Sequence, residues 1–376
     1  MKVVVTGAAG LLGWHTAVRL HAANCAARFR KETPPFEIVA LDHGAFADDK
    51  KLSNALRNAH SVLHFAGVNR GKEEDIRDGN PLIAKRLADA CKRLGVQPHI
   101  TYANSTHARF DSVYGISKRR AGEILSSIGG GLANLVLPHI FGEGARPRYN
   151  NVTATFIEAV IGDETPDVDS NGQVHLLHSG AASDAAIKAS VALYDGEISP
   201  TPVSTKVPEL LELIQRFHVD YASNLFPDLS DTHTRDLFNC YRAALFPKGY
   251  PKHFELNSDS RGTLFEIVRG GGGGQTFASW TEPSVTRGDH FHLNKVERFV
   301  VLEGDALIRI RRALGGPVRE YRVTGDIPVA IDMPTLHTHS IENVGNRPLL
   351  TLFWTHELFD PMAPDTYFDP VLQENA

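Results

Sequence analysis

The sequence predicts a doubly wound α/β domain built on a parallel sheet, followed by a smaller all-β domain. Across the first half of the 376 residues, short apolar runs alternate with helical patterns, which is typical of βαβ units. A glycine-rich turn follows the first of these runs directly. Beyond residue 251 the helical patterns end, and short strand-like runs separated by glycines follow one another. A series of short strands of this kind indicates a barrel or jelly roll.

The expected elements of the first half begin with the β-branched run Lys2–Thr6, a strand, and with Leu11–Ala23, a helix rich in Leu and Ala. Pro81–Leu94 carries apolar residues at helical spacing, and Asn80 stands where an N-cap would be. Two further short apolar runs are expected to be strands: Glu37–Leu41 and Ser61–Phe65.

Two prolines and a glycine in Phe246–Pro251 indicate a domain boundary. We therefore expect an N-terminal domain over residues 1–247 and a C-terminal domain over residues 252–376. The run Gly270–Gly274 is expected to form a hairpin tip. The strands expected in the second domain are Leu264–Arg269, Gln275–Trp280, Arg298–Leu302, Ala306–Arg311, Val318–Val323 and Leu349–Trp354.

The composition excludes several classes of protein. A formal charge of -5 argues against a broadly basic nucleic-acid binder, and 42% hydrophobic with 22% charged residues is typical of globular domains. The sequence contains no apolar run of about 18 residues, so no membrane span is expected. The N-terminus lacks the apolar stretch of a signal peptide, and the three cysteines stand far apart. These features predict a cytoplasmic protein.

The turn after the first expected strand predicts a nucleotide site. Gly7 permits a tight turn, Gly10 lets the backbone approach a pyrophosphate at the helix N-terminus, and Gly13 allows close packing of helix on strand. Leu11 opens the helix and is included with them as a cofactor-binding residue. The spacing is G-x-x-G-x-x-G, so a plain β–α turn is the alternative.

Asp42 ends the second expected strand. A carboxylate there would accept a hydrogen bond from a ribose 2′-OH and repel a 2′-phosphate, which favours NAD over NADP. A solvated turn aspartate is the alternative, and Lys50 and Lys51 could still reach a phosphate. After the third strand, Ala66 and Gly67 would let the chain pass close to the bound cofactor.

The spacing of Tyr114 and Lys118 predicts a proton donor for a hydride-transfer reaction. On a helix, residues four apart share one face, and a nearby ammonium would lower the pKa of the tyrosine. Tyr114 would then give a proton to a substrate oxygen as hydride reaches the carbon. Ser105, at the end of an expected strand, could bond the same oxygen, or it could be an ordinary strand-end serine.

The glycine motif together with Ser105, Tyr114 and Lys118 resembles the extended short-chain dehydrogenase/reductase superfamily over roughly the first two thirds of the chain. The resemblance implies a Rossmann-type sheet and a hydride exchanged between nicotinamide and a sugar carbon. In sugar-nucleotide 4,6-dehydratases an Asp-Glu pair follows the hydroxyl residue, where this chain has Thr106 and His107. Dehydration is therefore not expected.

A basic stretch with amide side chains follows at residues 146–151. In extended enzymes of this superfamily the region meets the nucleotide-sugar, so Arg146, Arg148 and Asn151 are expected to bind substrate. Guanidinium groups suit a diphosphate because they donate in pairs. The alternative is a solvated basic loop.

A second set of residues predicts a metal site. His290 and His292 would point to one face of a strand, Glu297 begins the next apolar run, and His339 comes from a later segment. Three imidazoles and one carboxylate suit a divalent ion such as Zn, Fe, Ni or Mn, with zinc the first choice.

These four residues resemble the two motifs of the cupin superfamily, whose fold is a jelly roll. Asn343 closes the second motif, and His337 lies outside it. Because His337 alternates with His339, it is expected on the same face, as a residue that supports the ligands or meets substrate.

The combination resembles the bifunctional capsular-polysaccharide and O-antigen enzymes of the N-acetyl-L-fucosamine pathway. The resemblance implies that the cupin epimerises C3 of a UDP-2-acetamido-2,6-dideoxy-4-hexulose. The reductase domain then reduces C4 to give UDP-N-acetyl-6-deoxy-L-talosamine. The resemblance to this family is strongest in four stretches: His64–Arg70, Tyr149–Phe156, Asp259–Gly262 and Phe359–Phe368.

That family uses NADPH, which conflicts with Asp42, so the expected cofactor is NADPH or NADH. The expected partner is a UDP-4-keto-6-deoxy-HexNAc, with a homodimer by family analogy and no nucleic acid or membrane. Two alternatives remain. One is a nucleotide-sugar 4-epimerase with tightly bound NAD and a structural cupin, and the other is a nucleotide-binding scaffold without catalysis.

Overall fold

The structure is a computed structural model that describes residues 1–270 and 273–372. Contacts along the chain separate it into two compact units, which are described one at a time. The first unit consists of Met1–Thr155 and Val168–Val207. The second consists of Phe156–Asp167 and Pro208–Ala376.

The expected boundary at residues 247–252 falls inside the second unit, because two helices group with the C-terminal strands. These are α8 (Val207–Ala222) and α9 (Thr232–Leu245). On α9, Arg242 donates a hydrogen bond of 2.7 Å to the main-chain oxygen of Met333. The prolines and glycine near residue 250 therefore mark a turn within the unit.

The sheet of the first unit confirms the predicted parallel architecture. Six strands pair in the order β2-β1-β3-β4-β5-β8, all parallel. The chain winds from β1 to β2 on one side and then to β3 on the other, which creates a switch point at their carboxyl ends. The strands are β1 (Lys2–Thr6), β2 (Glu37–Leu41), β3 (Ser61–His64), β4 (His99–Ser105), β5 (Leu132–Leu137) and β8 (Gly196–Ile198).

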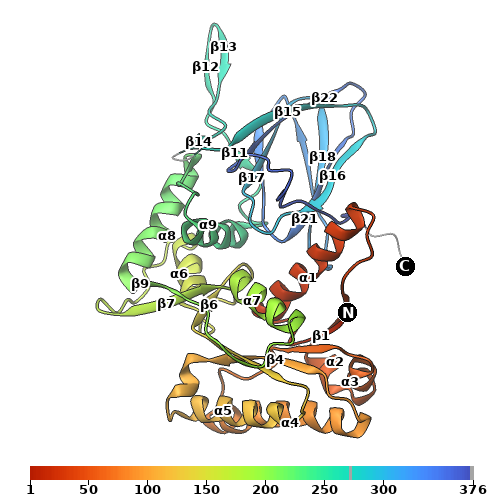
Figure 1. Cartoon of the computed structure of the whole chain (residues 1–376). Coiled ribbons are helices and arrows are strands. Elements are labelled where there is room, and N and C mark those ends of the chain that lie inside the picture. The colour runs from red at the N-terminus through yellow and green to blue at the C-terminus, as the bar shows by residue number, and fades with distance from the viewer. Residues whose placement is uncertain (271–272, 373–376) are drawn as a thin grey trace. The chain divides into compact units, whose positions relative to one another are not determined.

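Helices cover both faces of this sheet (Figure 1). One apolar cluster joins α3, α4 and α5 to the strands, and a second joins α1 and α7 to the opposite face. A small sheet of β6, β7 and β9 follows the main one. The remaining bounds are α1 (Leu11–Phe29), α2 (His43–Ala47), α3 (Asp49–Leu56), α4 (Glu73–Leu94), the 3-10 turn η1 (Thr106–Arg109), α5 (Val113–Ser126), α6 (Val152–Ile161), α7 (Ser179–Val191), β6 (His139–Phe141), β7 (Gln173–His178) and β9 (Val203–Lys206).

Helix α4 differs from its prediction at the N-terminus. It begins at Glu73 rather than Pro81, so Asn80 lies inside the helix and caps nothing. Three acidic residues occupy the first turn of α4, where negative charge complements the helix dipole. The carboxylate of one of them, Asp75, accepts a hydrogen bond of 3.2 Å from the N–H of Lys72.

The second unit contains two five-stranded antiparallel sheets, in the orders β11-β20-β17-β22-β15 and β19-β18-β21-β16-β23. Their facing sides enclose an apolar core that includes Phe299, Ile308, Ile331 and Phe353. The strands are β10 (Leu225–Phe226), β11 (Lys252–His253), β12 (Asn257–Asp259), β13 (Gly262–Leu264), β14 (Arg269–Gly270), β15 (Gln275–Thr281), β16 (Thr286–Phe291), β17 (Glu297–Glu303), β18 (Asp305–Arg312), β19 (Arg319–Thr324), β20 (Val329–Met333), β21 (His337–Asn343), β22 (Leu349–Thr355) and β23 (Tyr367–Phe368).

One expected strand is wrong. Leu264–Arg269 does not form a single strand, because its ends belong to β13 and β14. The β12–β13 hairpin extends away from the two sheets (Figure 1). Of the expected hairpin tip at Gly270–Gly274, residues 271 and 272 lie outside the described residues. Within the described part of the chain, no helix combines the length and the apolar character needed to cross a bilayer.

Candidate active site and metal centre

The glycine turn lies at the switch point of the parallel sheet, between β1 and α1. Gly7 has a positive φ of 67°, a conformation that glycine adopts without steric cost. A Cβ at Gly13 would lie 2.1 Å from the main-chain oxygen of Gly7, so only glycine lets α1 start this close to the turn. Gly10 is the N-cap of α1, and Leu11 is its first residue. The turn thus presents the N-terminus of a long helix at the ligand edge of the sheet.

Two segments next to the turn were expected to meet the cofactor. Asp42 is exposed and caps α2, because its Oδ1 accepts a hydrogen bond of 2.7 Å from the N–H of Ala45. The loop that contains Ala66 and Gly67 is held by Asn80, whose side-chain oxygen accepts a hydrogen bond of 3.0 Å from the N–H of Val68. The amide of Asn80 also donates to the main-chain oxygen of Val68 at 2.9 Å. Asn80 therefore fixes the loop rather than the helix end.

Ser105, Tyr114 and Lys118 come together in the first unit. Ser105 ends β4, and its Oγ accepts a hydrogen bond of 3.2 Å from the N–H of His107. Tyr114 and Lys118 lie one turn apart on α5, and the Ser105 side chain is near enough to the Tyr114 phenol to lower its pKa. The Nζ of Lys118 donates a hydrogen bond of 2.6 Å to the main-chain oxygen of Ala103.

Burial governs the ionisation of this group. Burial raises the pKa of Tyr114, an effect that the nearby Ser105 side chain opposes, and it lowers the pKa of Lys118 to about 7. The expectation that the Lys118 ammonium lowers the pKa of Tyr114 is therefore wrong for this structure, because desolvation favours the neutral form of both groups. A protonated phenol near neutral pH is nevertheless the state that a proton donor requires.

The basic loop at residues 146–151 folds back on its own unit. The guanidinium of Arg146 lies 5.2 Å from the centre of the Tyr149 ring, and the main-chain oxygen of Arg148 accepts a hydrogen bond from Arg70. Asn151 is buried and caps α6, since its Oδ1 accepts a hydrogen bond of 3.0 Å from the N–H of Ala154. The side chain of Asn151 is thus engaged by the backbone, whereas Arg146 and Arg148 are exposed.

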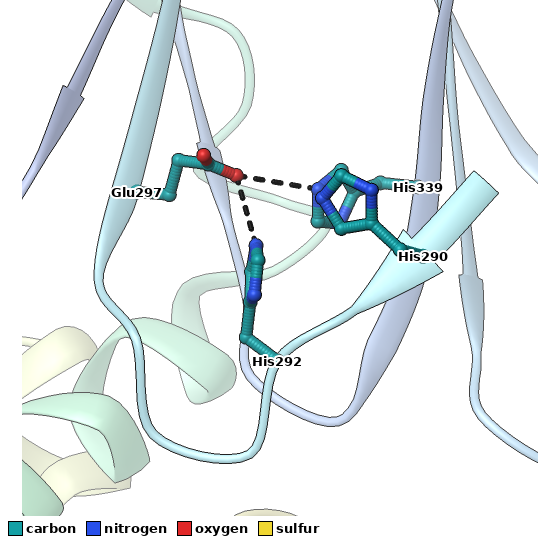
Figure 2. Close-up of side chains that lie close together, drawn as sticks. All are labelled: His290, His292, Glu297 and His339. Carbon is teal, nitrogen blue, oxygen red and sulfur yellow. Dashed lines mark hydrogen bonds and ion pairs between the residues drawn. The ribbon is translucent and has the colours of Figure 1, made fainter. Parts of the chain in front are cut away.

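In the second unit the structure brings together all four expected metal ligands, and their donor atoms lie within 4.8 Å of one another. Figure 2 shows the Glu297 carboxylate facing His292 and His339, with His290 beside His339. The Nε2 of His292 is 3.1 Å from Oε2 of Glu297, and that of His339 is 3.3 Å from the same oxygen. His290 and His339 pair across β16 and β21. The site therefore draws on three strands and the loop that connects β16 to β17.

The electrostatics of the group fit a cation. Burial opposes the negative charge of Glu297, yet the facing imidazoles hold its pKa well below its usual range. Burial, together with the neighbouring His339 and His292, lowers the pKa of His290 well below 6.5, so its imidazole is neutral and able to bind a metal. The Nε2 of His339 is buried and makes no hydrogen bond. Such an orphaned lone pair next to a buried carboxylate is what a bound divalent ion would satisfy.

A C-terminal residue that the sequence reasoning missed supports this group. Asp365 accepts hydrogen bonds with its carboxylate from the N–H groups of Leu293 at 2.9 Å and of Asn294 and Lys295 at 2.8 Å. A pocket of about 430 Å³ opens beside the candidate ligands. Its other walls include Gln275, Phe277, Lys295, Thr355, Glu357, Phe359 and Thr366.

His337 and Asn343, the other two residues singled out near His339, lie outside the group of candidate ligands. The ring of His337 packs against that of Phe246 at 5.2 Å, and its Nδ1 lies 2.8 Å from the main-chain oxygen of Thr335. His337 is not part of the four-residue group. The side-chain nitrogen of Asn343 donates to the main-chain oxygens of Thr281 and Arg347, both at 2.8 Å, so Asn343 ties together the loops at the end of β21.

The chain is similar to known proteins in both of its halves and along its whole length. Residues 3–183 match the NAD dependent epimerase/dehydratase family, and residues 257–367 match the polysaccharide biosynthesis C-terminal domain. The UDP-2-acetamido-2,6-beta-L-arabino-hexul-4-ose reductase of Pseudomonas aeruginosa is 31% identical over 381 residues, which cover 98% of each protein. The capsular polysaccharide assembling protein CapF of Staphylococcus aureus has a crystal structure that covers 99% of this chain and 100% of its own, with 26% identity and a TM-score of 0.58. A second structure of CapF, with the inhibitor 3-isopropenyl-tropolone, gives 27% identity, the same coverage and a TM-score of 0.55.

A parallel sheet with a glycine turn at its switch point, and a serine, tyrosine and lysine beside it, defines an oxidoreductase of the short-chain dehydrogenase/reductase class. An antiparallel β domain follows it in the same chain. The chain belongs to the family of the UDP-2-acetamido-2,6-beta-L-arabino-hexul-4-ose reductase of Pseudomonas aeruginosa.

Proposed function

We propose that this chain is a bifunctional nucleotide-sugar enzyme that serves surface-polysaccharide synthesis. Its C-terminal domain, a cupin, epimerises C3 of a UDP-2-acetamido-2,6-dideoxy-4-hexulose, and its N-terminal domain reduces the C4 ketone to UDP-N-acetyl-6-deoxy-L-talosamine. The observation that carries the proposal is the placement of Ser105, at the end of β4, near Tyr114 and Lys118 on α5. Whole-length similarity to a hexul-4-ose reductase supports the choice of substrate.

The reduction follows from the residues of the first unit. A reduced nicotinamide cofactor, NADPH or NADH, supplies the hydride that adds to C4 of the sugar. Tyr114 donates its phenolic proton to the C4 oxygen as the carbonyl bond becomes a C–O single bond. Ser105 holds the same oxygen through its hydroxyl. Arg146 and Arg148 are exposed on the loop proposed to hold the diphosphate of the sugar nucleotide.

The epimerisation belongs to the second unit. His290, His292, Glu297 and His339 would hold a divalent ion, zinc by the mixed nitrogen and oxygen donor set. Such an ion, when bound, polarises a carbonyl oxygen and so acidifies the proton on the neighbouring C3. Transfer of this proton to a base, and delivery of a solvent-exchangeable proton to the opposite face, inverts C3 without any net redox change. The pocket beside the ligands provides the space for the sugar ring.

The test supplies a UDP-4-keto-6-deoxy-HexNAc in D2O and follows deuterium at C3 and cofactor oxidation separately. His290→Ala is expected to abolish metal binding and C3 exchange while cofactor binding is kept. Tyr114→Phe is expected to lose C4 reduction by about 10²- to 10⁴-fold while C3 exchange is kept. The matched controls are exposed residues of the same type, His253→Ala and Tyr194→Phe.

Other outcomes would point elsewhere. Interconversion of C4 epimers without net cofactor oxidation would favour a 4-epimerase with a structural C-terminal domain. Cofactor binding without turnover, in both the wild type and Tyr114→Phe, would favour a scaffold without catalysis. We also infer a cytoplasmic homodimer by family analogy, which light scattering of the purified chain and fractionation of the source cells would check.

A further inference from the structure

A second group of metal-ligating side chains lies in the first unit, apart from Ser105 and Tyr114. His15 comes from α1, two residues after the glycine turn, and Glu143 follows β6. His178 is the last residue of β7. Their donor atoms lie within 4.8 Å of one another. Neither the family profiles nor the catalytic chemistry of the unit gives these three residues a role.

Both imidazoles converge on one carboxylate oxygen. The Nε2 of His178 lies 2.9 Å from Oε2 of Glu143, and the Nε2 of His15 lies 3.8 Å from the same atom. The Nε2 of His15 is also 2.9 Å from the main-chain oxygen of Glu143. The candidate metal centre of the second unit has the same arrangement, with two Nε2 atoms at 3.1 and 3.3 Å from Oε2 of Glu297.

The group is buried. The side chains of His15, Glu143 and His178 are 0%, 1% and 6% exposed. Burial lowers the pKa of His15 to about 3, so this imidazole is neutral. Arg19 is the nearby cation, but its Nε already lies 3.2 Å from a carboxylate oxygen of Asp184. Glu143, unlike the exposed Asp184, is buried, and a buried carboxylate is stable only when cations or hydrogen-bond donors surround it.

The packing around the imidazoles keeps space that side chains would fill. A Cβ at Gly142 would lie 3.1 Å from Cε1 of His15, and a Cβ at Gly180 would lie 2.9 Å from Nδ1 of His178. The Nδ1 of His15 is buried without a hydrogen-bond partner. The hydrogen bonding of His15 is thus incomplete. Glycine at positions 142 and 180 lets the backbone lie close to the two imidazoles without a steric clash.

We propose that His15, Glu143 and His178 form a structural site for a divalent cation of the zinc type. The donors are the two Nε2 atoms and the carboxylate, with the main-chain oxygen of Glu143 as the fourth ligand. Two imidazoles and one carboxylate are an established zinc donor set. The ion ties α1, directly after the glycine turn, to the segment that leads into residues 146–151. This inference does not depend on the proposed function.

The test uses the full chain with His290→Ala and His339→Ala together, which removes the candidate metal centre of the second unit. After loading with zinc and gel filtration, elemental analysis is expected to find about one zinc ion per chain. Adding Glu143→Gln, or His178→Gln in a separate variant, is expected to reduce zinc to the buffer level. His175→Gln, an exposed histidine on the same strand, is the matched control and should retain the ion.

A second readout covers variants that fold poorly. Zinc should raise the thermal unfolding midpoint of the chain that carries only the His290→Ala and His339→Ala changes, because the ion binds the folded state. A folded protein of this kind that binds no zinc, and whose midpoint zinc leaves unchanged, overturns the inference. If this protein and the wild type each contain about one zinc ion, the second unit binds no zinc. The site in the first unit would then account for all of the bound metal.

Discussion

The main-chain oxygen of Asp365 accepts a hydrogen bond of 2.6 Å from Nδ1 of His292. This bond places the Nδ1 proton of His292 away from the other candidate ligands, so that Nε2 faces Glu297. Through its carboxylate the same residue holds three successive N–H groups of the loop after His292. Outer partners of this kind orient the imidazoles of metal sites.

Asp365→Ala keeps the main-chain oxygen that bonds His292 but removes the carboxylate that holds the loop after His292. The substitution is therefore expected to weaken zinc binding at the candidate centre about 10- to 100-fold, the usual effect of disturbing the groups that orient a ligand. Competition with a chromophoric chelator measures the affinity, with His178→Gln in the background to silence the first unit. Asp360→Ala is the control, since Asp360 is exposed and bonds only locally, to the N–H of Met362. Equal affinities in the two variants would contradict the positioning role of Asp365.

Gly13→Ala should disrupt the nucleotide site. The new Cβ would lie 2.1 Å from the main-chain oxygen of Gly7, so either α1 or the turn must move. The affinity for NADPH or NADH, measured by fluorescence or calorimetry, is expected to fall below detection. The control is Gly44→Ala, where the nearest atom would be at an ordinary 3.7 Å. Normal cofactor affinity in a folded Gly13→Ala protein would show that the turn is not the binding element.

The buried His64 predicts acid sensitivity of the first unit. Burial, aided by the charge of Lys118, lowers its pKa from 6.5 to about 3, while the unfolded chain takes up a proton near 6.5. The free energy of unfolding should therefore fall as the pH drops from 6.5 towards 3, by on the order of a few kcal/mol for this residue. Urea titrations at several pH values measure the slope.

His64→Asn should flatten that slope, whereas the exposed His43→Asn should leave it unchanged. An identical slope in His64→Asn and the wild type would mean that His64 does not stay neutral in the folded protein.

The buried Arg298–Asp332 pair predicts a strong asymmetry between single and double substitutions. Both side chains are 0% exposed and joined at 2.6 Å, and Asp332 also accepts a hydrogen bond from Tyr221. Arg298→Met leaves a buried carboxylate without its main partner and should cost about 3–5 kcal/mol. Arg298→Met combined with Asp332→Leu should cost much less. Denaturant unfolding of the four proteins checks this, and additive losses would be the contrary result.

The parts of the fold that sequence could predict depend on local signals. The parallel sheet follows from apolar runs that alternate with helices, and the turn at Gly7 from its position after a strand. The ligands His290, His292 and Glu297 lie within eight residues of one another, so spacing alone groups them. Only His339 required the second motif.

Contacts between distant segments could not be predicted in this way. Asp365 reaches His292 across 73 residues, and His15 reaches Glu143 across 128, with no local pattern in either case. Helix α9 (Thr232–Leu245) groups with the second unit, and no local signal in its sequence indicates which unit buries its apolar face. The pKa of Tyr114 depends on burial, which only the tertiary structure decides.

The hydrogen bond between His292 and Asp365 also determines when the metal can bind during synthesis of the chain. A ribosome makes a chain from its N-terminus, so the loop after His292 leaves it 73 residues before the aspartate that clamps it. Until then the imidazole has no fixed orientation. Metal loading of the second unit is thus expected only after Asp365 has left the ribosome, and a stalled nascent chain that ends before Asp365 would have a poorly formed centre.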